Sequence, residues 1–182
     1  MKQPPRPAGR YAVGNSDAEI ARLQQLGELL QPSTRQVLRE AGVAGGMSVL
    51  DVGCGPGSVS FLAAELAGPT GAVVGIDNNP AMLVTARAHA LASGAPIVSF
   101  LEADLTELGA EGWLEPGFDA IIGRLILLHV PDPAALLRTL ARHLRPGGVT
   151  VFQEPDLTRM GASFLRQQVL MGTRSGRTIR GR

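Results

Sequence analysis

LDVGCGPGSVS, residues 50–60, decides what fold and what kind of site the chain can have. The apolar run that begins at Ser48 predicts a short buried strand, and VSFLAAELA, residues 59–67, predicts a helix. Between them Gly53, Gly55 and Gly57 occupy every second position. A glycine-rich turn between a strand and a helix has few side chains, so a ligand can approach its main chain closely. Such a turn also serves close packing alone, so it does not identify a ligand by itself.

The same alternation of strand and helix continues along the chain. Asn79-Pro80 and Asp132-Pro133 each place a helix-capping side chain directly before a proline, which predicts two helix starts. The strands show little polar alternation, as expected of a parallel sheet with helices on both faces. The fold class is therefore α/β and Rossmann-like. Five strands are recognisable, within residues 48–52, 71–77, 96–104, 117–127 and 145–154, and helices are expected at 16–30, from about 32, and at 59–67, 81–93 and 134–144.

Length and charge suggest one domain between a disordered N-terminus and a basic C-terminal tail. We divide the 182 residues into a disordered N-terminus (1–10), a ligand-binding domain (11–156) with an N-terminal helical cap (11–45), and a short basic tail (157–182). The tail holds six arginines and no acid, whereas the body is mildly acidic. An acidic body argues against nucleic acid as the partner. An arginine-rich tail could still serve as an RNA- or phosphate-binding arm.

Cys54 is the only cysteine, so neither a disulfide framework nor a cysteine-cluster zinc site is possible, and we expect no metal. It is expected to pack as a small apolar residue. The N-terminus lacks the apolar segment of a signal peptide, and no run is long enough to span a membrane. We therefore expect a cytoplasmic protein without a membrane partner. The abundance of arginine is typical of a high-GC bacterial source.

Asp77 ends the second expected strand, 20 residues after Gly57. A carboxylate at this place can accept hydrogen bonds from both hydroxyls of a ribose. Glycine turn and acid together indicate an adenine nucleoside. A dinucleotide site usually reads G-x-G-x-x-G, but here the sixth position is Ser58, so an NAD(P)-dependent oxidoreductase is the less favoured alternative.

Five motifs occur in a set order: DVGCGPG, GID, LEADL, FDAIIGRLILLH and LRPGG. Together they resemble the successive motifs of class I S-adenosylmethionine-dependent methyltransferases. The resemblance spans residues 11–156 and is closest to the small-molecule branch that includes the ubiquinone and menaquinone biosynthesis enzymes. It implies an enzyme that moves a methyl group from S-adenosylmethionine to an O, N or C atom of a small molecule. A truncated remnant that binds the cofactor without turnover is the alternative.

The resemblance also implies roles for individual residues at the first strand. Asp51, Gly53 and Gly55 would hold the methionine end of the cofactor, and Asp77 would bind the ribose. Tyr11 resembles part of an N-terminal segment that closes over the cofactor in some relatives.

Further cofactor contacts are implied beyond the second and third strands. Asn78 and Met82 would flank the adenine, Asp104 would accept from its amino group, and Leu105 would pack on the ring. Arg124 follows the fourth strand, where the methionine moiety and the methyl acceptor would meet.

His129 and Arg124 are the candidates for a direct part in the reaction. His129 is either a general base or acceptor contact, or a structurally satisfied histidine at a loop edge. A charge at Arg124 interrupts an apolar run and would need a partner if buried. Glu154 either contacts the acceptor or caps a helix, and Asp119 is expected to tie down its own turn.

The C-terminus departs from the family pattern, which adds a helix and an antiparallel strand pair after the fifth strand. Residues 157–182 suggest one helix near 161–171 and no convincing strand pair, so the last two strands are expected to be missing. The fifth strand would then be an exposed apolar edge through which the chain could self-associate.

Overall fold

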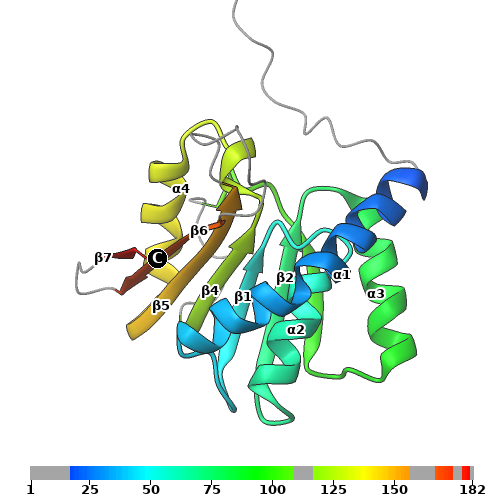
Figure 1. Cartoon of the computed structure of the whole chain (residues 1–182), viewed down its shortest axis with the longest axis horizontal. Helices are drawn as coiled ribbons and strands as arrows, with labels where there is room; N and C mark the ends of the chain where they lie inside the picture. Colours follow the sequence, from blue (N-terminus) through cyan, green and yellow to red (C-terminus); the bar gives the residue numbers. More distant parts are fainter. Residues whose placement is uncertain (1–16, 109–116, 156–166, 174–177, 181–182) are drawn as a thin grey trace, which may run out of the picture.

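The computed structural model describes residues 17–108, 117–155, 167–173 and 178–180. It contains a seven-stranded sheet in the order β3-β2-β1-β4-β5-β6-β7 (Figure 1). The first five strands are parallel, which confirms the Rossmann-like α/β fold expected from the sequence. Their bounds are β1 (Ser48–Val52), β2 (Ala72–Asp77), β3 (Val98–Glu102), β4 (Phe118–Arg124) and β5 (Leu144–Pro155).

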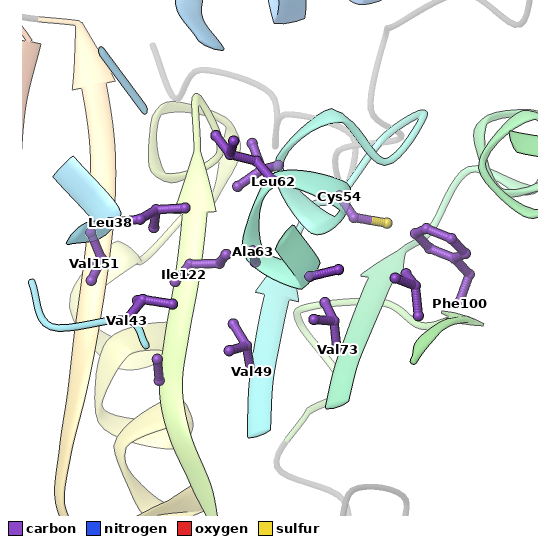
Figure 2. Packing of buried hydrophobic residues seen from close by; sticks show 14 of the residues in the cluster. Leu38, Val43, Val49, Cys54, Leu62, Ala63, Val73, Phe100, Ile122 and Val151 are labelled. Atoms are coloured by element: carbon purple, nitrogen blue, oxygen red, sulfur yellow. The ribbon is translucent and has the colours of Figure 1, made fainter. Parts of the chain in front are cut away.

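Helices cover both faces of the sheet. One face carries α1 (Asp17–Glu40), α2 (Ser58–Ala67) and α3 (Pro80–Ser93), and α4 (Pro133–Leu140) lies on the other (Figure 1). β1 sits at the centre, so its side chains alternate between two apolar cores: Val49 faces α2 and Leu50 faces α4. Figure 2 shows the first core, with Leu62 and Ala63 of α2 packed over β1. Packing in these two cores fixes the positions of the strands, and with them the positions of their carboxyl ends.

The expected helix starts at α3 and α4 are confirmed. Asn79 Oδ1 accepts a hydrogen bond from Ala81 N at 3.0 Å, and Asp132 Oδ1 accepts one from Ala135 N at 2.9 Å. In both helices the proline occupies the first turn, where its missing N–H would have no helical partner.

The prediction of a second helix starting near Pro32 is wrong, because α1 continues through this residue to Glu40. Leu30, Thr34 and Leu38 form one buried stripe at four-residue spacing on both sides of the proline. Packing of that stripe on the sheet holds one helix together where local propensity favours a break.

The prediction that the last two strands are missing is also wrong. β6 (Gln167–Thr173) pairs antiparallel with β5, and β7 (Thr178–Arg180) pairs antiparallel with β6. The helix expected near 161–171 is a strand from residue 167, while residues 161–166 lie outside the described part. β5 is therefore not an edge strand, which removes the reason to expect self-association through it. The sheet extends into the stretch treated above as a basic tail.

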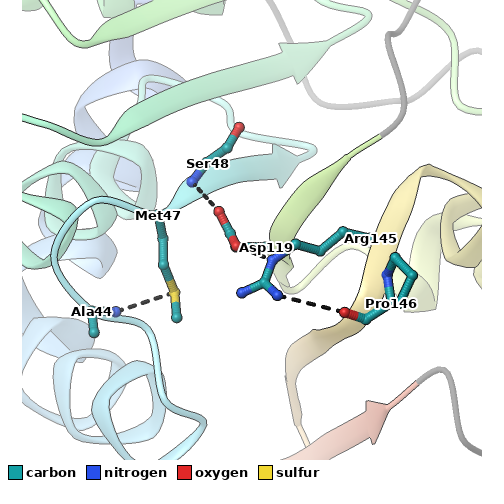
Figure 3. A network of polar contacts seen from close by, with 6 residues as sticks. All are labelled: Ala44, Met47, Ser48, Asp119, Arg145 and Pro146. Atoms are coloured by element: carbon teal, nitrogen blue, oxygen red, sulfur yellow. Dashed lines mark hydrogen bonds and ion pairs between the residues drawn. The ribbon is translucent and has the colours of Figure 1, made fainter.

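Asp119 lies at the opposite, amino-terminal edge of the sheet, where it ties together neighbouring strands rather than its own turn as expected. Its Oδ2 accepts from Ser48 N at 2.7 Å, and its Oδ1 forms an ion pair with Arg145 (Figure 3). These bonds join the starts of β1, β4 and β5, away from the glycine turn. No helix among the described residues is long and apolar enough to cross a membrane.

Candidate functional site

The glycine turn lies at the carboxyl end of β1 and depends on its glycines. Gly53, Gly55 and Gly57 have φ angles of 69°, 54° and 91°, in the left-handed region that glycine tolerates best. The main-chain N–H groups of Gly53 and Cys54 both donate to Ile76 O, at 2.8 and 3.0 Å, which ties the turn to β2. A Cβ atom at Gly55 would meet nothing within 4 Å, so its main chain faces open space.

Asp77 stands beside this turn at the end of β2. Its Oδ2 accepts from Gly55 N at 2.8 Å, and its Oδ1 accepts from Asn79 N at 2.9 Å. Burial raises the pKa of Asp77, and the main-chain hydrogen bonds partly oppose that rise. Each carboxylate oxygen has a further lone pair, so Asp77 can hold the turn and still accept bonds from a ligand.

Asp51 is a second acid close to the turn, in β1. It is only 1% exposed and accepts a hydrogen bond from Ser60 Oγ of α2 at 2.5 Å. Burial raises its pKa to about 6, an effect opposed by the Ser60 bond and by Arg124 and increased by the charge of Asp77. Asp51 and Asp77 therefore place two carboxyl groups close to the turn, with Arg124 as a counter-charge to Asp51. In their ionised form the two carboxylates suit a cationic ligand group and disfavour a diphosphate.

Arg124, the last residue of β4, belongs to a polar network that joins the sheet to α1. Its Nη1 donates to Thr34 Oγ1 at 3.1 Å. Thr34 Oγ1 also lies 2.9 Å from Leu30 O and 2.7 Å from Gln153 Oε1, so its single proton serves one of these two acceptors. Burial lowers the pKa of Arg124, and the charge of Asp51 raises it. The guanidinium thus counters the acid beneath the turn.

Sequence reasoning missed Thr34 and Gln153, which are only 2% and 3% exposed. The available signal was Gln153 itself, a polar residue that directly follows the mostly apolar stretch 149–152 near the end of β5. Its partner on α1 lies 119 positions away along the chain, so no local pattern could reveal it.

The residues expected near the adenine lie beyond β2 and β3. Ala103 N donates to Asp77 O at 2.9 Å, which brings the segment after β3 next to Asp77. Asp104 is exposed, and its Oδ1 accepts from Thr106 N and Oγ1 at 2.8 and 2.7 Å. Leu105 is half-buried against the core on the α4 side. Asp104 therefore retains a second oxygen for a ligand.

The other three residues expected to contact the cofactor, Asn78, Met82 and Tyr11, differ in how far the structure exposes or describes them. Asn78 is exposed beside Asp77, whereas Met82 is 2% exposed in the core beneath the first turn of α3. Tyr11 lies outside the described residues.

His129 closes a short 3-10 turn after β4 (Leu127–His129). His129 is largely exposed, but the part of it that is removed from water lowers its pKa below the usual 6.5. The neutral form of the imidazole therefore prevails at pH 7. Glu154 caps this turn: its Oε1 accepts from Ile126 N at 2.9 Å and from Leu127 N at 3.0 Å. The capping interpretation of Glu154 is confirmed, for a 3-10 turn rather than an α-helix.

A groove of about 710 Å³ runs along the outside of α2, between α1 and α3. It reaches the glycine turn at Pro56 and Ser58, but Asp77 is not part of its wall. Its walls include Gln31 and Phe61. In the described part of the chain, no three or more His, Cys, Asp or Glu side chains gather as metal ligands would. Cys54 is buried and packs in the core, as expected.

Comparison with known proteins identifies the family. A family model described as "Methyltransferase domain" matches residues 44–174, and the chain belongs to this family. A ubiquinone biosynthesis O-methyltransferase of Paracidovorax citrulli is 37% identical over 66% of this chain and 48% of the relative. A trans-aconitate 2-methyltransferase of Azoarcus sp. is 36% identical over 68% of this chain and 45% of the relative. The chain spans about half the length of the curated relatives it matches.

A solved structure supports the architecture. The crystal structure of a SAM-dependent methyltransferase from Aquifex aeolicus superposes with a TM-score of 0.65, covering 75% of this chain and 73% of that one. At 23% identity the likeness concerns the fold, and it agrees with the parallel sheet and helices described above.

Proposed function

We propose that this chain binds S-adenosylmethionine at the glycine turn and transfers its methyl group to an O, N or C atom of a small molecule. Membership of the methyltransferase family supports the reaction class. The names of the two relatives, an O-methyltransferase of ubiquinone biosynthesis and a trans-aconitate methyltransferase, support a small-molecule acceptor.

The observation that carries the proposal is the pair of acids at the turn. Asp77 bonds directly to Gly55 N, and Asp51 lies buried below the turn with its pKa raised to about 6. The proposed cofactor presents a ribose diol, an ammonium and a sulfonium, and all three are favoured by nearby carboxylates. A dinucleotide would instead bring a diphosphate, which two carboxylates would repel.

The residues present fit the cofactor in distinct roles. Asp77 would accept from the ribose hydroxyls, and the open main chain at Gly53 and Gly55 would face the methionine end. Asp51 and Arg124 would set the charge beneath it, with Arg124 available to a carboxylate group. The open space at Gly55, where a Cβ atom would meet nothing within 4 Å, leaves room for this approach.

The adenine would lie between the segments that follow β2 and β3. Asn78 and the free oxygen of Asp104 would bond its edge, while Leu105 would pack on the ring. Met82 would act from within the core by shaping this wall, since its side chain is buried. Tyr11 stays a proposed closing residue.

S-adenosylmethionine supplies, when bound, a methyl group already activated by its sulfonium. The chain's own task is to orient an acceptor atom and to keep water away, and positioning of this kind contributes up to about 7–11 kcal/mol to catalysis. We propose that His129, neutral at pH 7, contacts the acceptor or takes its proton. Arg124 is proposed to act from the cofactor side, because its observed bond runs to Thr34.

The proposed setting is the bacterial cytoplasm, with no nucleic-acid or membrane partner. The single cysteine and the acidic body of the chain support this part of the proposal.

Calorimetry with S-adenosylmethionine, S-adenosylhomocysteine and NAD tests the cofactor assignment. We expect both adenosyl compounds to bind and NAD not to bind. Transfer of labelled methyl from S-adenosylmethionine to phenols, catechols, amines and carboxylic acids, trans-aconitate included, then separates an enzyme from a binding remnant. Binding of NAD without binding of the adenosyl compounds would favour an oxidoreductase and refute the proposal.

A further inference from the structure

The segment after β4 adopts a conformation that neighbouring residues must hold in place. Leu125 has φ 57°, and it is the only non-glycine residue in the described ranges with a positive φ. A leucine enters this region at an energetic cost and stays there only when surrounding contacts fix it. Leu128 and His129, three and four residues on, are exposed beyond the end of the strand. The backbone of this segment therefore sets where His129 stands.

The end of β5 supplies the contacts that fix it. Leu125 N donates to Gln153 O at 3.0 Å, and the next two main-chain N–H groups, of Ile126 and Leu127, donate to Oε1 of Glu154 at 2.9 and 3.0 Å. One carboxylate oxygen thus serves two successive donors. The other oxygen, Oε2, is buried without a hydrogen-bond partner in the described part of the structure. Oε1 of Glu154 is therefore the atom that holds this turn.

The segment after β4 also packs against the glycine turn. Ile126 is 4% exposed, and a Cβ atom at Gly53 would lie 2.5 Å from its Cδ1 atom. The side chain of Ile126 thus fills the space that the bare backbone of Gly53 leaves. A shift of Ile126 would move His129 relative to the turn that is proposed to hold the cofactor.

We propose that Glu154 is a positioning residue for methyl transfer, which fixes His129 relative to the glycine turn through its hydrogen bonds to Ile126 N and Leu127 N. This inference rests on the proposed function. It assigns Glu154 an effect on transfer rather than on cofactor binding, because its contacts lie on the β4–β5 side of the site and Asp77 lies on the β2 side. A misplacement of about 1 Å is enough to reduce a rate 100-fold.

Three variants test this role in the whole 182-residue chain. Glu154→Ala removes the acceptor, Glu154→Asp keeps the charge on a shorter side chain, and Glu154→Gln keeps a carbonyl oxygen at the same distance. We expect kcat for labelled methyl transfer, with the best acceptor of the panel above, to fall about 10–100-fold in the alanine variant. The aspartate variant should be intermediate, and the glutamine variant should stay within about threefold of the wild type. The Kd for S-adenosylhomocysteine should change less than about threefold in all three.

Amide hydrogen exchange provides a readout that needs no substrate. Exchange at Ile126 and Leu127 should accelerate in the alanine and aspartate variants but not in the glutamine variant, while exchange at the centre of β4 stays unchanged. Glu40→Ala is the matched control, because this exposed glutamate at the end of α1 bonds only to the nearby Gln36 Nε2 among the contacts described. It should alter neither readout. If the alanine variant does not fold, the aspartate and glutamine variants still make the comparison.

The outcomes separate this inference from the proposed function. An active wild type whose alanine variant retains its kcat, or whose exchange at Ile126 and Leu127 is unaltered, would overturn the role of Glu154 alone. A glutamine variant as impaired as the alanine variant would also overturn it, since the acceptor oxygen would not matter. A wild type without methyl transfer would refute the proposed function and this inference with it.

Discussion

Replacing Asp77 with alanine should weaken the binding of S-adenosylmethionine about 10–100-fold. Asp77 lies at the end of β2, bonded to the glycine turn through Gly55 N at 2.8 Å. Burial already raises its pKa, so the carboxylate is partly dehydrated and positioned before a ligand arrives. Hydrogen bonds from ribose hydroxyls to such a group are charge-assisted and contribute about 1.5–3 kcal/mol each. The net loss of about one such bond, about 1.4–2.8 kcal/mol, corresponds to the stated 10–100-fold change in Kd.

The same change should also lower stability, because two main-chain N–H groups lose their acceptor. Gly55 N and Asn79 N each bond to one oxygen of Asp77, and we expect the free energy of unfolding to fall by about 1–2 kcal/mol. Asp77→Asn keeps only one of the two bonds, because its single amide oxygen can accept from one main-chain N–H while its NH2 group faces the other donor. This variant should therefore also lose some stability, and it should bind the cofactor more weakly than the wild type does.

Isothermal titration with S-adenosylmethionine and S-adenosylhomocysteine, together with urea denaturation, measures both quantities. Asp132→Ala is a suitable control, because it removes a comparable carboxylate cap at the start of α4. It should cost about 1 kcal/mol of stability and leave the Kd unaltered. A Kd for Asp77→Ala equal to that of the wild type would refute the ribose assignment, and with it the reason for placing the cofactor at this turn.

Three further changes test how the site is built. Asp51 has a pKa of about 6 in the folded chain against 3.8 ordinarily, so the folded state binds more protons than the unfolded state between these pH values. The free energy of unfolding should therefore fall by up to about 3 kcal/mol as the pH rises from about 4 to about 6. In urea titrations across that range, Asp51→Asn should make this fall shallower. Gly53→Ala should destabilise the chain by about 2 kcal/mol or more in thermal unfolding, because its φ is 69° and the new Cβ would overlap Ile126. Thr34→Val should cost about 1–3 kcal/mol in urea denaturation, because it removes the buried hydroxyl that bonds to Arg124 Nη1 and Gln153 Oε1.

The glycine and threonine changes each have a counterpart elsewhere in the chain. Gly94→Ala has a similar φ of 61° with nothing within 4 Å of the new Cβ, so it should cost only about 1–2 kcal/mol. Thr85→Val removes a hydroxyl that bonds only within α3 among the contacts described, and should be nearly neutral. Equal effects in a variant and its counterpart would contradict the local contacts on which that prediction rests.

The parallel sheet and the glycine turn could be predicted because their signals are local. A buried strand, a bare turn and a capped helix each occupy a few consecutive residues, and Asn79-Pro80 marks a helix start without reference to the rest of the chain. The family motifs added the order of these units. The positions of Asp51 and Asp77 beside the turn followed from the rule that parallel strands end at one edge.

The features that the sequence did not predict depend on contacts between residues far apart in the chain. Pro32 favours a helix break locally, but the buried stripe that includes Thr34 and Leu38 packs on the sheet and keeps α1 continuous. Residues 167–173 form a strand because β5 offers unpaired main-chain groups along its edge, a condition that their own apolar pattern does not contain. The link from Thr34 to Gln153 and Arg124 likewise arises only when β4, β5 and α1 meet.

A crystal structure of the chain with S-adenosylhomocysteine tests the central claim most directly. We predict that the ribose hydroxyls lie within about 3 Å of the Asp77 carboxylate oxygens, with the homocysteine end over the main chain of Gly53 and Gly55. Binding in the groove outside α2, or a ribose that does not touch Asp77, would contradict the claim.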